Sequence, residues 1–312
     1  QKDYFGCGVH SIMWGDRSSD ICIRNGSFMT LEEVRRNIDR VDGEIKRLFK
    51  ERMELADNVA RVKAETGDVI YKPDREEVII NTLTADVDDN IKREYTALIK
   101  RIMEVSRKYQ YGRTLELRDC FPVQYEEHEP ELKIPAMLDR EVHLCDEDLR
   151  DSVVVADTFE GVAELINNGS ADCGMGVIED IGYGVSDALH DILTGNGLYI
   201  CRCKVVNEDG HKKKLVTFSE HLAAEEEHNR IKIMFVCKNH SGSLGSVLSM
   251  IADYGVNLTE IHSVPYTNTD WNYRIYAELN ANFRRKDIKA LIFQLINETE
   301  EFKVLGSYCC NE

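Results

Sequence analysis

Two cations in one long predicted helix are the first residues whose types and spacing could do chemistry. Apolar residues between positions 34 and 62 follow an alternating four-three spacing, and Arg52 stands where an apolar residue is expected between Leu48 and Leu55. Lys63 follows eleven residues later, which returns it to within about 20° of the same face, with the two Cα atoms about 16 Å apart. Two long cationic side chains leaning toward each other would leave a gap suited to a small anion.

A third cation, Arg35, lies seventeen residues before Arg52 in the same helix. It therefore points roughly 100° away from Arg52 and cannot easily share that gap within one straight helix. It could reach the gap of a symmetry-related copy. The alternative for each cation alone is a side chain that extends into solvent from a hydrated face.

Further polar residues strengthen the case for an anion site. Arg75 and Glu76 stand side by side at the start of a second predicted helix, and Ser106 and Gln110 are four residues apart, on one face of a third. The complete set holds four cations, one carboxylate, one hydroxyl and one amide, with no evident nucleophile, histidine or metal cluster. It favours binding of a small dianion over proton transfer, and we expect neither a cofactor nor a metal.

The element that must position the first cations is a helix of about 37 residues. Thr30 and Glu33 form a capping box at its start, and Gly67 stands where glycine favours a helix end. At about 55 Å, such a helix must pack against a partner, most simply the same helix of a second subunit. A second helix is expected near 74–84 and a third near 88–110, before Gly112.

These residues carry a resemblance to the all-helical chorismate mutase family, which covers residues 30–112. Members of that family are intertwined homodimers with three helices per chain. The matching positions are Arg35, Arg52 within "ERMEL", Lys63, Arg75 and Glu76 within "KPDRE", Ser106 and Gln110. One position departs, because Lys72 stands where many members have aspartate.

The resemblance implies the rearrangement of chorismate to prephenate, a pericyclic reaction that needs no acid, base or covalent intermediate. The protein must hold a flexible dicarboxylate in a compact shape and stabilise charge on the breaking ether oxygen. By resemblance, Arg52 and the partner's Arg35 bind the carboxylates, with help from Ser106. Lys63 and Gln110 face the ether oxygen. Glu76 accepts from the ring hydroxyl, and Arg75 completes the polar wall and holds Glu76.

A middle segment, residues 138–228, has α+β texture and resembles part of a prephenate dehydratase. "ADCGMGVIED" matches a strand and turn of that family, with Glu179 and Asp180 at the turn. The family's threonine-arginine-phenylalanine motif is present only as "VTF", Val216 to Phe218, and a second lobe of about a hundred residues is not visible. We expect a degenerate scaffold without dehydratase activity.

The C-terminal segment, residues 229–312, has the order strand, helix, strand, strand, helix, strand of a ferredoxin-like unit. It resembles an ACT regulatory domain, which implies an aromatic amino-acid effector bound at residues Gly242, Ser243, Leu244, His262 and Ser263. "HSVP" stands where phenylalanine-responsive members have "ESRP". A packing and dimerisation module without a ligand is the alternative.

Composition limits the remaining possibilities. The chain has 312 residues, 43% of them hydrophobic and 30% charged, and a net charge of −17. That charge argues against a nucleic-acid partner, and no apolar run is long enough to span a membrane. Ten cysteines without a CxxC pair or a secretory leader favour the reducing cytoplasm.

The sequence thus predicts a multidomain protein. It comprises a disordered leader (1–28), a three-helix mutase (29–112), a linker (113–137), the degenerate segment (138–228) and the ACT domain (229–312). The predicted function is a chorismate mutase acting on chorismate, as a homodimer or larger oligomer. One rival is a bifunctional chorismate mutase/prephenate dehydratase, and another is a non-catalytic amino-acid sensor that keeps the helices for dimerisation.

Overall fold

Helices form the N-terminal third of the described chain. A computed structural model describes residues 23–24, 27–208, 210–237, 241–266 and 272–311, which leaves most of the predicted leader outside the described residues. The chain divides into two compact units, residues 1–56 and 57–312. The first elements are β1 (Ile23–Arg24), β2 (Ser27–Phe28), α1 (Leu31–Thr66), α2 (Pro73–Thr84) and α3 (Asp89–Leu117).

The predicted ends of α1 are confirmed. The Thr30 backbone N–H donates to Glu33 Oε2 at 2.8 Å, and the Glu33 N–H donates to Thr30 Oγ1 at 3.3 Å, which is the reciprocal pattern of a capping box. Gly67 follows the last turn with a φ of 73°, a backbone conformation that glycine adopts without strain.

The apolar stripe of α1 is left largely uncovered in the single chain. Ile45, Leu48 and Leu55 expose 52%, 53% and 60% of their surface. Helices in soluble proteins gain most of their stability by burying such a stripe, so this face requires a partner surface.

The third helix is longer than expected. It continues through Gly112 to Leu117, so the predicted helix end near residue 110 is wrong. The physical reason is packing: a Cβ added to Gly112 would lie 3.9 Å from the side chain of Ala290 in α8 (Lys286–Glu298). That distance is an ordinary contact, and the neighbouring Tyr111 ring lies 5.4 Å from that of Phe293 in α8, so contacts with α8 accompany the continuation of the helix through Gly112.

Residues 135–219 form the middle segment, which is of mixed α/β type. Its strands are β3 (Pro135–Leu138), β4 (Val154–Ala156), β5 (Cys173–Asp180), β6 (Gly184–Val185), β7 (Tyr199–Glu208) and β8 (His211–Ser219). Its helices are η2 (Asp139–Leu144), α4 (Glu147–Arg150), α5 (Phe159–Asn167) and α6 (Asp187–Asn196). Strand β3 is parallel to both β4 and β5, whereas β8 is antiparallel to β5 and β7.

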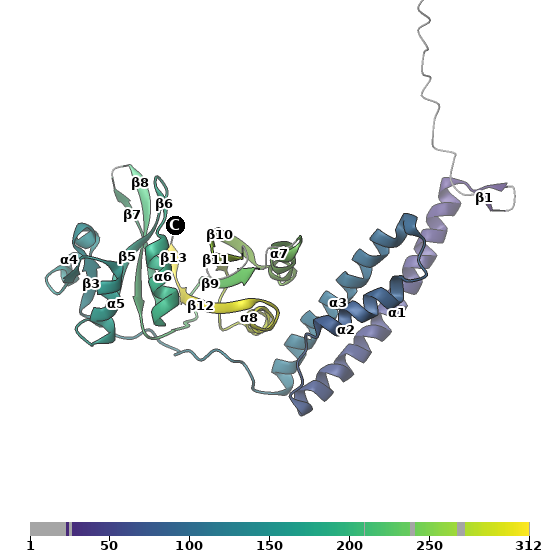
Figure 1. Ribbon diagram of the computed structural model, residues 1–312, viewed down its shortest axis with the longest axis horizontal. Coiled ribbons are helices and arrows are strands. Elements are labelled where there is room, and N and C mark those ends of the chain that lie inside the picture. Colours follow the sequence, from purple (N-terminus) through teal and green to yellow (C-terminus); the bar gives the residue numbers. More distant parts are fainter. Residues whose placement is uncertain (1–22, 25–26, 209, 238–240, 267–271, 312) are drawn as a thin grey trace, which may run out of the picture. The chain divides into compact units, whose positions relative to one another are not determined.

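The order of strands and helices predicted for the C-terminal unit is confirmed. Its elements are β9 (Arg230–Cys237), α7 (Ser243–Asp253), β10 (Asn257–Pro265), β11 (Tyr273–Asn280), α8, β12 (Glu300–Tyr308) and a short β13 (Cys310–Asn311). The sheet order β10-β11-β9-β12 is that of a ferredoxin-like unit. Figure 1 shows α7 and α8 on one side of these strands, where Phe235, Ile251 and Leu291 belong to one buried cluster.

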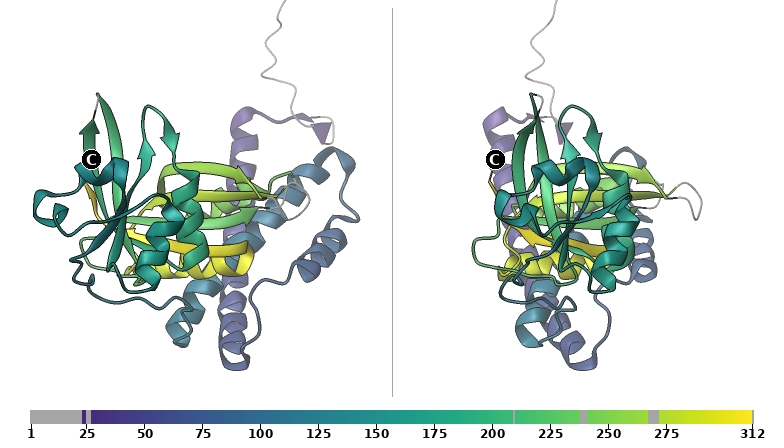
Figure 2. Two further views of the ribbon diagram at one scale, coloured as in Figure 1. Left: turned by 60° about the vertical axis from the view of Figure 1, so that its left-hand side comes forward. Right: turned by 90° about the vertical axis from the view of Figure 1, so that its left-hand side faces the viewer.

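The two α/β parts share one sheet, which the sequence did not predict. Strand β12 pairs in parallel with β7, so the order runs β10-β11-β9-β12-β7-β8-β5-β3-β4. Figure 2 gives two further views of these strands. Gly306 makes the junction possible, because a Cβ at that position would lie 2.3 Å from the Ile200 carbonyl oxygen. None of the described helices is long and apolar enough to cross a bilayer.

A buried histidine packs between α6 and this sheet. His190 is fully buried, its Nδ1 lies 2.8 Å from the Ser186 carbonyl oxygen, and its ring lies 4.6 Å from those of His262 and Tyr276. Burial, reinforced by the positive charge of Lys232, lowers the pKa of His190 to about 3. His190 is therefore neutral in the folded chain over the whole range in which an unfolded histidine takes up a proton.

This lowered pKa predicts a loss of stability in acid. Between the unfolded histidine's pKa and about pH 3, only the unfolded chain binds the extra proton, so the free energy of unfolding falls by about 1 kcal/mol per pH unit from this group. We expect His190→Gln to reduce that slope, measured by urea unfolding at a series of pH values from 7 to 4. The exposed His128 supplies the matched control; an equal change of slope in His128→Gln would contradict the assignment.

Candidate active site

Two of the seven predicted site residues lie in the first unit, on α1. Arg35 is exposed, and Arg52 is half-buried. Both are carried by the same continuous helix as Lys63. The remaining five residues lie in the second unit.

Lys63 is half-buried near the end of α1. Its Nζ donates to the Ile70 carbonyl oxygen at 2.8 Å. Burial is the main cause that lowers the pKa of Lys63, and Asp68 opposes that effect. Lys72 and Arg75 lower this pKa further, whereas Glu76 raises it. Lys63 is thus a desolvated ammonium group with cations and a carboxylate near it.

The second helix places Arg75 and Glu76 in its first turn. Pro73 occupies the first helical position, where its fixed φ suits a helix start and its missing N–H is not needed. The Glu76 N–H donates to the Lys72 carbonyl oxygen at 3.1 Å, which closes the first turn. Lys72 itself pairs with Asp68, so this departure from the family pattern is balanced by a local ion pair.

Ser106 and Gln110 lie together in α3 and are both buried, as their spacing predicted. Ser106 Oγ donates to the Ile102 carbonyl oxygen at 2.8 Å, and Gln110 Nε2 donates to the Ser106 carbonyl oxygen at 3.2 Å. The Gln110 Oε1 atom is buried and has no hydrogen-bond partner among the described residues. An unpaired buried amide oxygen costs about 1–3 kcal/mol, a cost typical of a site that pairs with a ligand.

The residue that holds Glu76 is Arg107, which the sequence reasoning missed. Arg107 Nη1 lies 2.6 Å from Glu76 Oε1 and 2.5 Å from Oε2. The prediction had assigned this contact to Arg75, which is exposed. The available signal was weak: Arg107 is one residue after Ser106 and one helical turn before Gln110.

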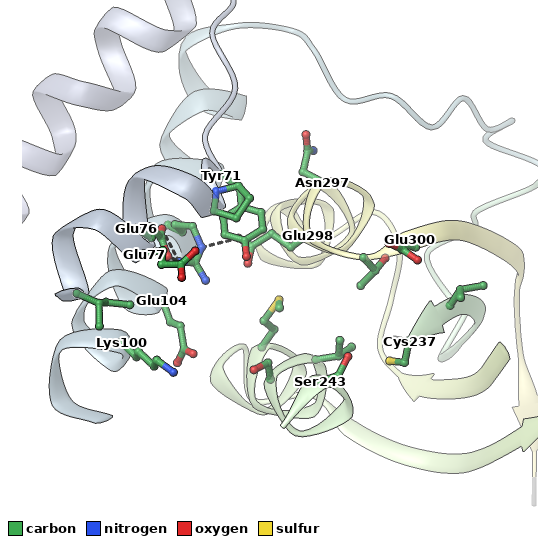
Figure 3. A pocket seen from close by; sticks show the side chains of 18 of the residues that line it. Tyr71, Glu76, Glu77, Lys100, Glu104, Cys237, Ser243, Asn297, Glu298 and Glu300 are labelled. Carbon is green, nitrogen blue, oxygen red and sulfur yellow. Dashed lines mark hydrogen bonds and ion pairs between the residues drawn. The ribbon is translucent and has the colours of Figure 1, made fainter. Parts of the chain in front are cut away.

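A cavity of about 950 Å³ opens beside this ion pair (Figure 3). Its lining comes from α2, α3, β9, α7 and α8. Among the predicted residues it includes Glu76 and Ser243, and it does not include Lys63, Ser106 or Gln110. In one chain the cavity therefore does not gather the predicted mutase residues; it joins one of them to the C-terminal unit.

The predicted effector residues lie on two faces of the C-terminal sheet. Gly242 caps α7 with a φ of 88°, and Ser243 and Leu244 form its first turn. Ser263 pairs in the sheet with Ile275, whose side chain contacts the α7 and α8 cluster. His262 pairs with Tyr276 on the opposite face and contacts His190 of α6. The structure thus separates His262 from the others.

The residues of the middle segment that resemble a dehydratase lie in its core or form ion pairs and local hydrogen bonds. Val216 and Phe218 of β8 are buried in the core with Leu189 and Ile200. Glu179 at the end of β5 pairs with Lys214 at 2.8 Å, and the Gly182 N–H donates to Asp180 Oδ1 at 2.8 Å. These polar residues are thus satisfied by structural contacts.

One cluster has the side-chain types of a metal site. His190, Glu260 and His262 bring ligand atoms within 4.8 Å of one another, a grouping hidden from the sequence by about 70 intervening residues. However, Lys232 Nζ lies 2.5 Å from Glu260 Oε1, so the carboxylate already has a cationic partner. A second cation there would face repulsion from this buried ammonium group.

Comparison with known proteins gives a family for the helical part. Residues 34–111 match the family model of chorismate mutase type II. A chorismate mutase from Methanocaldococcus jannaschii is 33% identical over 85 residues, which cover 25% of this chain and 86% of that protein. A bifunctional chorismate mutase/prephenate dehydratase from Aquifex aeolicus is 20% identical over 352 residues, or 89% of this chain and 97% of that protein.

Solved structures resemble the chain over 57% of its length. GqqA, described as a novel type of quorum quenching acylase, aligns with a TM-score of 0.50 at 20% identity, over 57% of this chain and 96% of its own. A prephenate dehydratase from Arthrobacter aurescens in complex with L-Phe aligns with a TM-score of 0.49 at 14% identity, over 57% of this chain and 90% of its own. At these identities the likeness to GqqA concerns the fold alone.

Proposed function

Because this chain belongs to the chorismate mutase family, we propose that its predicted polar residues convert chorismate to prephenate at a site that two subunits share. The main support is that residues 34–111 match the type II family and contain, on three helices, all seven polar residues that the sequence predicted for the site. This makes the chain an isomerase. A non-catalytic sensor would have no need to keep these side chains.

The reaction requires positive charges held in fixed positions that match the two carboxylates of the substrate. Arg52 and the partner subunit's Arg35 bind the substrate carboxylates through guanidinium forks, which suit bidentate contacts. Lys63 and Gln110 donate toward the ether oxygen as the C–O bond breaks and negative charge develops there. The half-desolvated Lys63 supports this role, because a charge outside bulk water interacts more strongly with such an oxyanion.

A homodimer is proposed for two independent reasons. The stripe of α1 exposes Ile45, Leu48 and Leu55, and a second copy of the same helix would cover it. Arg35 points away from the face of Arg52 by its helical spacing, so its place is in the site of the other subunit. We propose a cytoplasmic location, in keeping with the described cysteines, which form no disulfide with one another.

The C-terminal unit is proposed to be an ACT-like regulatory module, and the middle segment to be inactive. The N-terminus of α7 at Gly242 to Leu244 could accept an amino-acid carboxylate. The bifunctional Aquifex aeolicus relative aligns over more positions than this chain contains, so part of that enzyme has no counterpart here. This supports the loss of a dehydratase lobe.

Lys63→Ala should lower kcat at least about a hundredfold, because one donor to the developing oxyanion is worth on the order of 3 kcal/mol.

The wild-type pH profile gives a second test of Lys63. Because the pKa of Lys63 is lowered, its positive charge is lost at a lower pH than that of an ordinary lysine, and kcat/KM should fall on the alkaline side at that lower pH. Loss of chorismate absorbance measures both, with the exposed Lys46→Ala as control. Wild-type turnover in Lys63→Ala would refute the role.

Mixing two inactive variants tests the shared site. Arg35→Ala and Lys63→Ala place their defects in different sites of a heterodimer, so one site carries both changes and the other is intact. Random pairing should restore roughly a quarter of wild-type activity in a co-expressed mixture. Arg52→Ala with Lys63→Ala is the control that should stay inactive, because both residues serve the same site. Equal recovery in both mixtures would exclude the proposed arrangement.

Product analysis tests the remaining parts of the protein. With chorismate as substrate, prephenate should accumulate without phenylpyruvate, because the cleft of a two-lobed dehydratase is missing. L-phenylalanine should change the mutase rate or the melting temperature if α7 binds an effector. Phenylpyruvate formed from pure prephenate would establish the bifunctional alternative. Unchanged rate and melting temperature across a phenylalanine titration would favour a packing module without a ligand.

A further inference from the structure

Arg107 links the mutase helices to the C-terminal unit through one guanidinium group. Its Nη1 donates to both oxygens of Glu76 in α2, and its Nε donates to Glu298 Oε1 in α8 at 2.9 Å. In Figure 3, Glu76 and Glu298 lie beside the same wall of the cavity, and dashed lines mark the contacts. One cation is thus divided between two carboxylates from elements more than 200 residues apart.

The charges make this group costly to disturb. The side chains of Arg107 and Glu298 expose only 9% and 2% of their surface. Burial acts to lower the pKa of Arg107, but the two carboxylates outweigh it and raise that pKa. Burial raises the pKa of Glu298, and Arg107 opposes this effect. A buried carboxylate that loses its cation is strongly destabilised, so Glu298 keeps Arg107 in place.

The orientation of the guanidinium is fixed from a third direction. Its central carbon lies 4.7 Å from the centre of the Tyr71 ring, which precedes α2. A guanidinium stacked on an aromatic face and hydrogen-bonded at two edges has little rotational freedom. Glu76 is therefore held by a rigid donor whose own position depends on α8.

We propose that Arg107 is a positioning residue for Glu76, and that Glu298 sets how firmly Arg107 holds it. The inference rests on the proposed role of Glu76 as acceptor for the ring hydroxyl of chorismate. Ser243 at the start of α7 lines the same cavity as Glu76 and Glu298. A ligand or movement at that end of the C-terminal unit would therefore act on the carboxylate that the substrate needs.

The competing explanation is that Arg107 only docks α8 on α3. The chain offers a matched control for it, because Arg101 of α3 also pairs with the C-terminal unit, at Asp253, without contacting Glu76. If docking is all that matters, Arg101→Gln and Arg107→Gln should act alike. If positioning matters, only changes at Arg107 and Glu298 should alter the ionisation of the site.

The pH profile separates these readings. The charged groups near Glu76 come from several elements: Lys63 of α1, Arg75 and Glu77 of α2, Lys100, Glu104 and Arg107 of α3, Glu298 of α8 and Glu300 of β12. Removing the Arg107 cation makes protonation of the neighbouring carboxylate easier, whereas removing the Glu298 charge makes it harder. The two substitutions should therefore move the acid limb of kcat/KM in opposite directions.

The experiment uses the full chain and four variants, with folding checked by thermal melting. Arg107→Gln should lower kcat/KM about tenfold and shift the acid limb to higher pH, and Glu298→Gln should shift it to lower pH. Arg107→Lys, which keeps the charge but not the fork, should return the limb toward wild type. Arg101→Gln should leave it in place.

The outcomes separate this inference from the function on which it rests. Suppose that the wild type is active. The positioning role is then overturned, and the mutase function kept, if the acid limb stays unmoved in both Arg107→Gln and Glu298→Gln. The same holds if the limb moves in one direction in these two variants and in Arg101→Gln. Wild type without turnover would remove both. If Arg107→Gln does not fold, the comparison of Glu298→Gln with Arg101→Gln decides whether the positioning role holds, because Glu298→Gln removes a charge without changing the shape of the side chain.

Discussion

A buried carboxylate needs a cation, and that requirement connects the parts of residues 57–312. Glu298 of α8 is almost fully enclosed and pairs with Arg107 of α3 at 2.9 Å. The same guanidinium is the partner of Glu76 in α2. Because neither carboxylate can lose this donor without a cost of several kcal/mol, the helical segment and the sheet cannot be treated as independent modules. The contact between them is part of the environment of Glu76, the carboxylate proposed to accept from the substrate hydroxyl.

The sequence predicted well those features that depend on neighbours in the chain. The capping box at Thr30, the end at Gly67 and the strand and helix order of the C-terminal unit follow local rules of capping and periodicity, and all are confirmed. The sequence predicted poorly those features that depend on contacts between residues far apart in the chain. The helix of Gly112 continues to Leu117 and contacts α8, and Arg107 was missed because its two partners come from α2 and α8.

The middle segment is joined to the C-terminal unit through one sheet. Val216 lies in the core of the middle segment, and β7 pairs in parallel with β12, so that the sheet continues into the C-terminal strands. An ion pair also links the two parts, because Lys214 of β8 contacts Glu179 of β5 and lies 3.7 Å from Glu260 of β10, which Lys232 also contacts. Paired ions of this kind fix one geometry.

An acidic protein that binds a dianion must concentrate its cations. The net charge of −17 would repel such a substrate from most of the surface, so affinity depends on a local group of arginine and lysine. Five of the seven proposed residues belong to residues 57–312, and Gln110 there keeps an unpaired buried oxygen. The other two lie on the half of α1 whose apolar stripe is uncovered. In the proposed dimer, the surface that a second subunit would cover thus also carries the two remaining arginines proposed to bind the substrate.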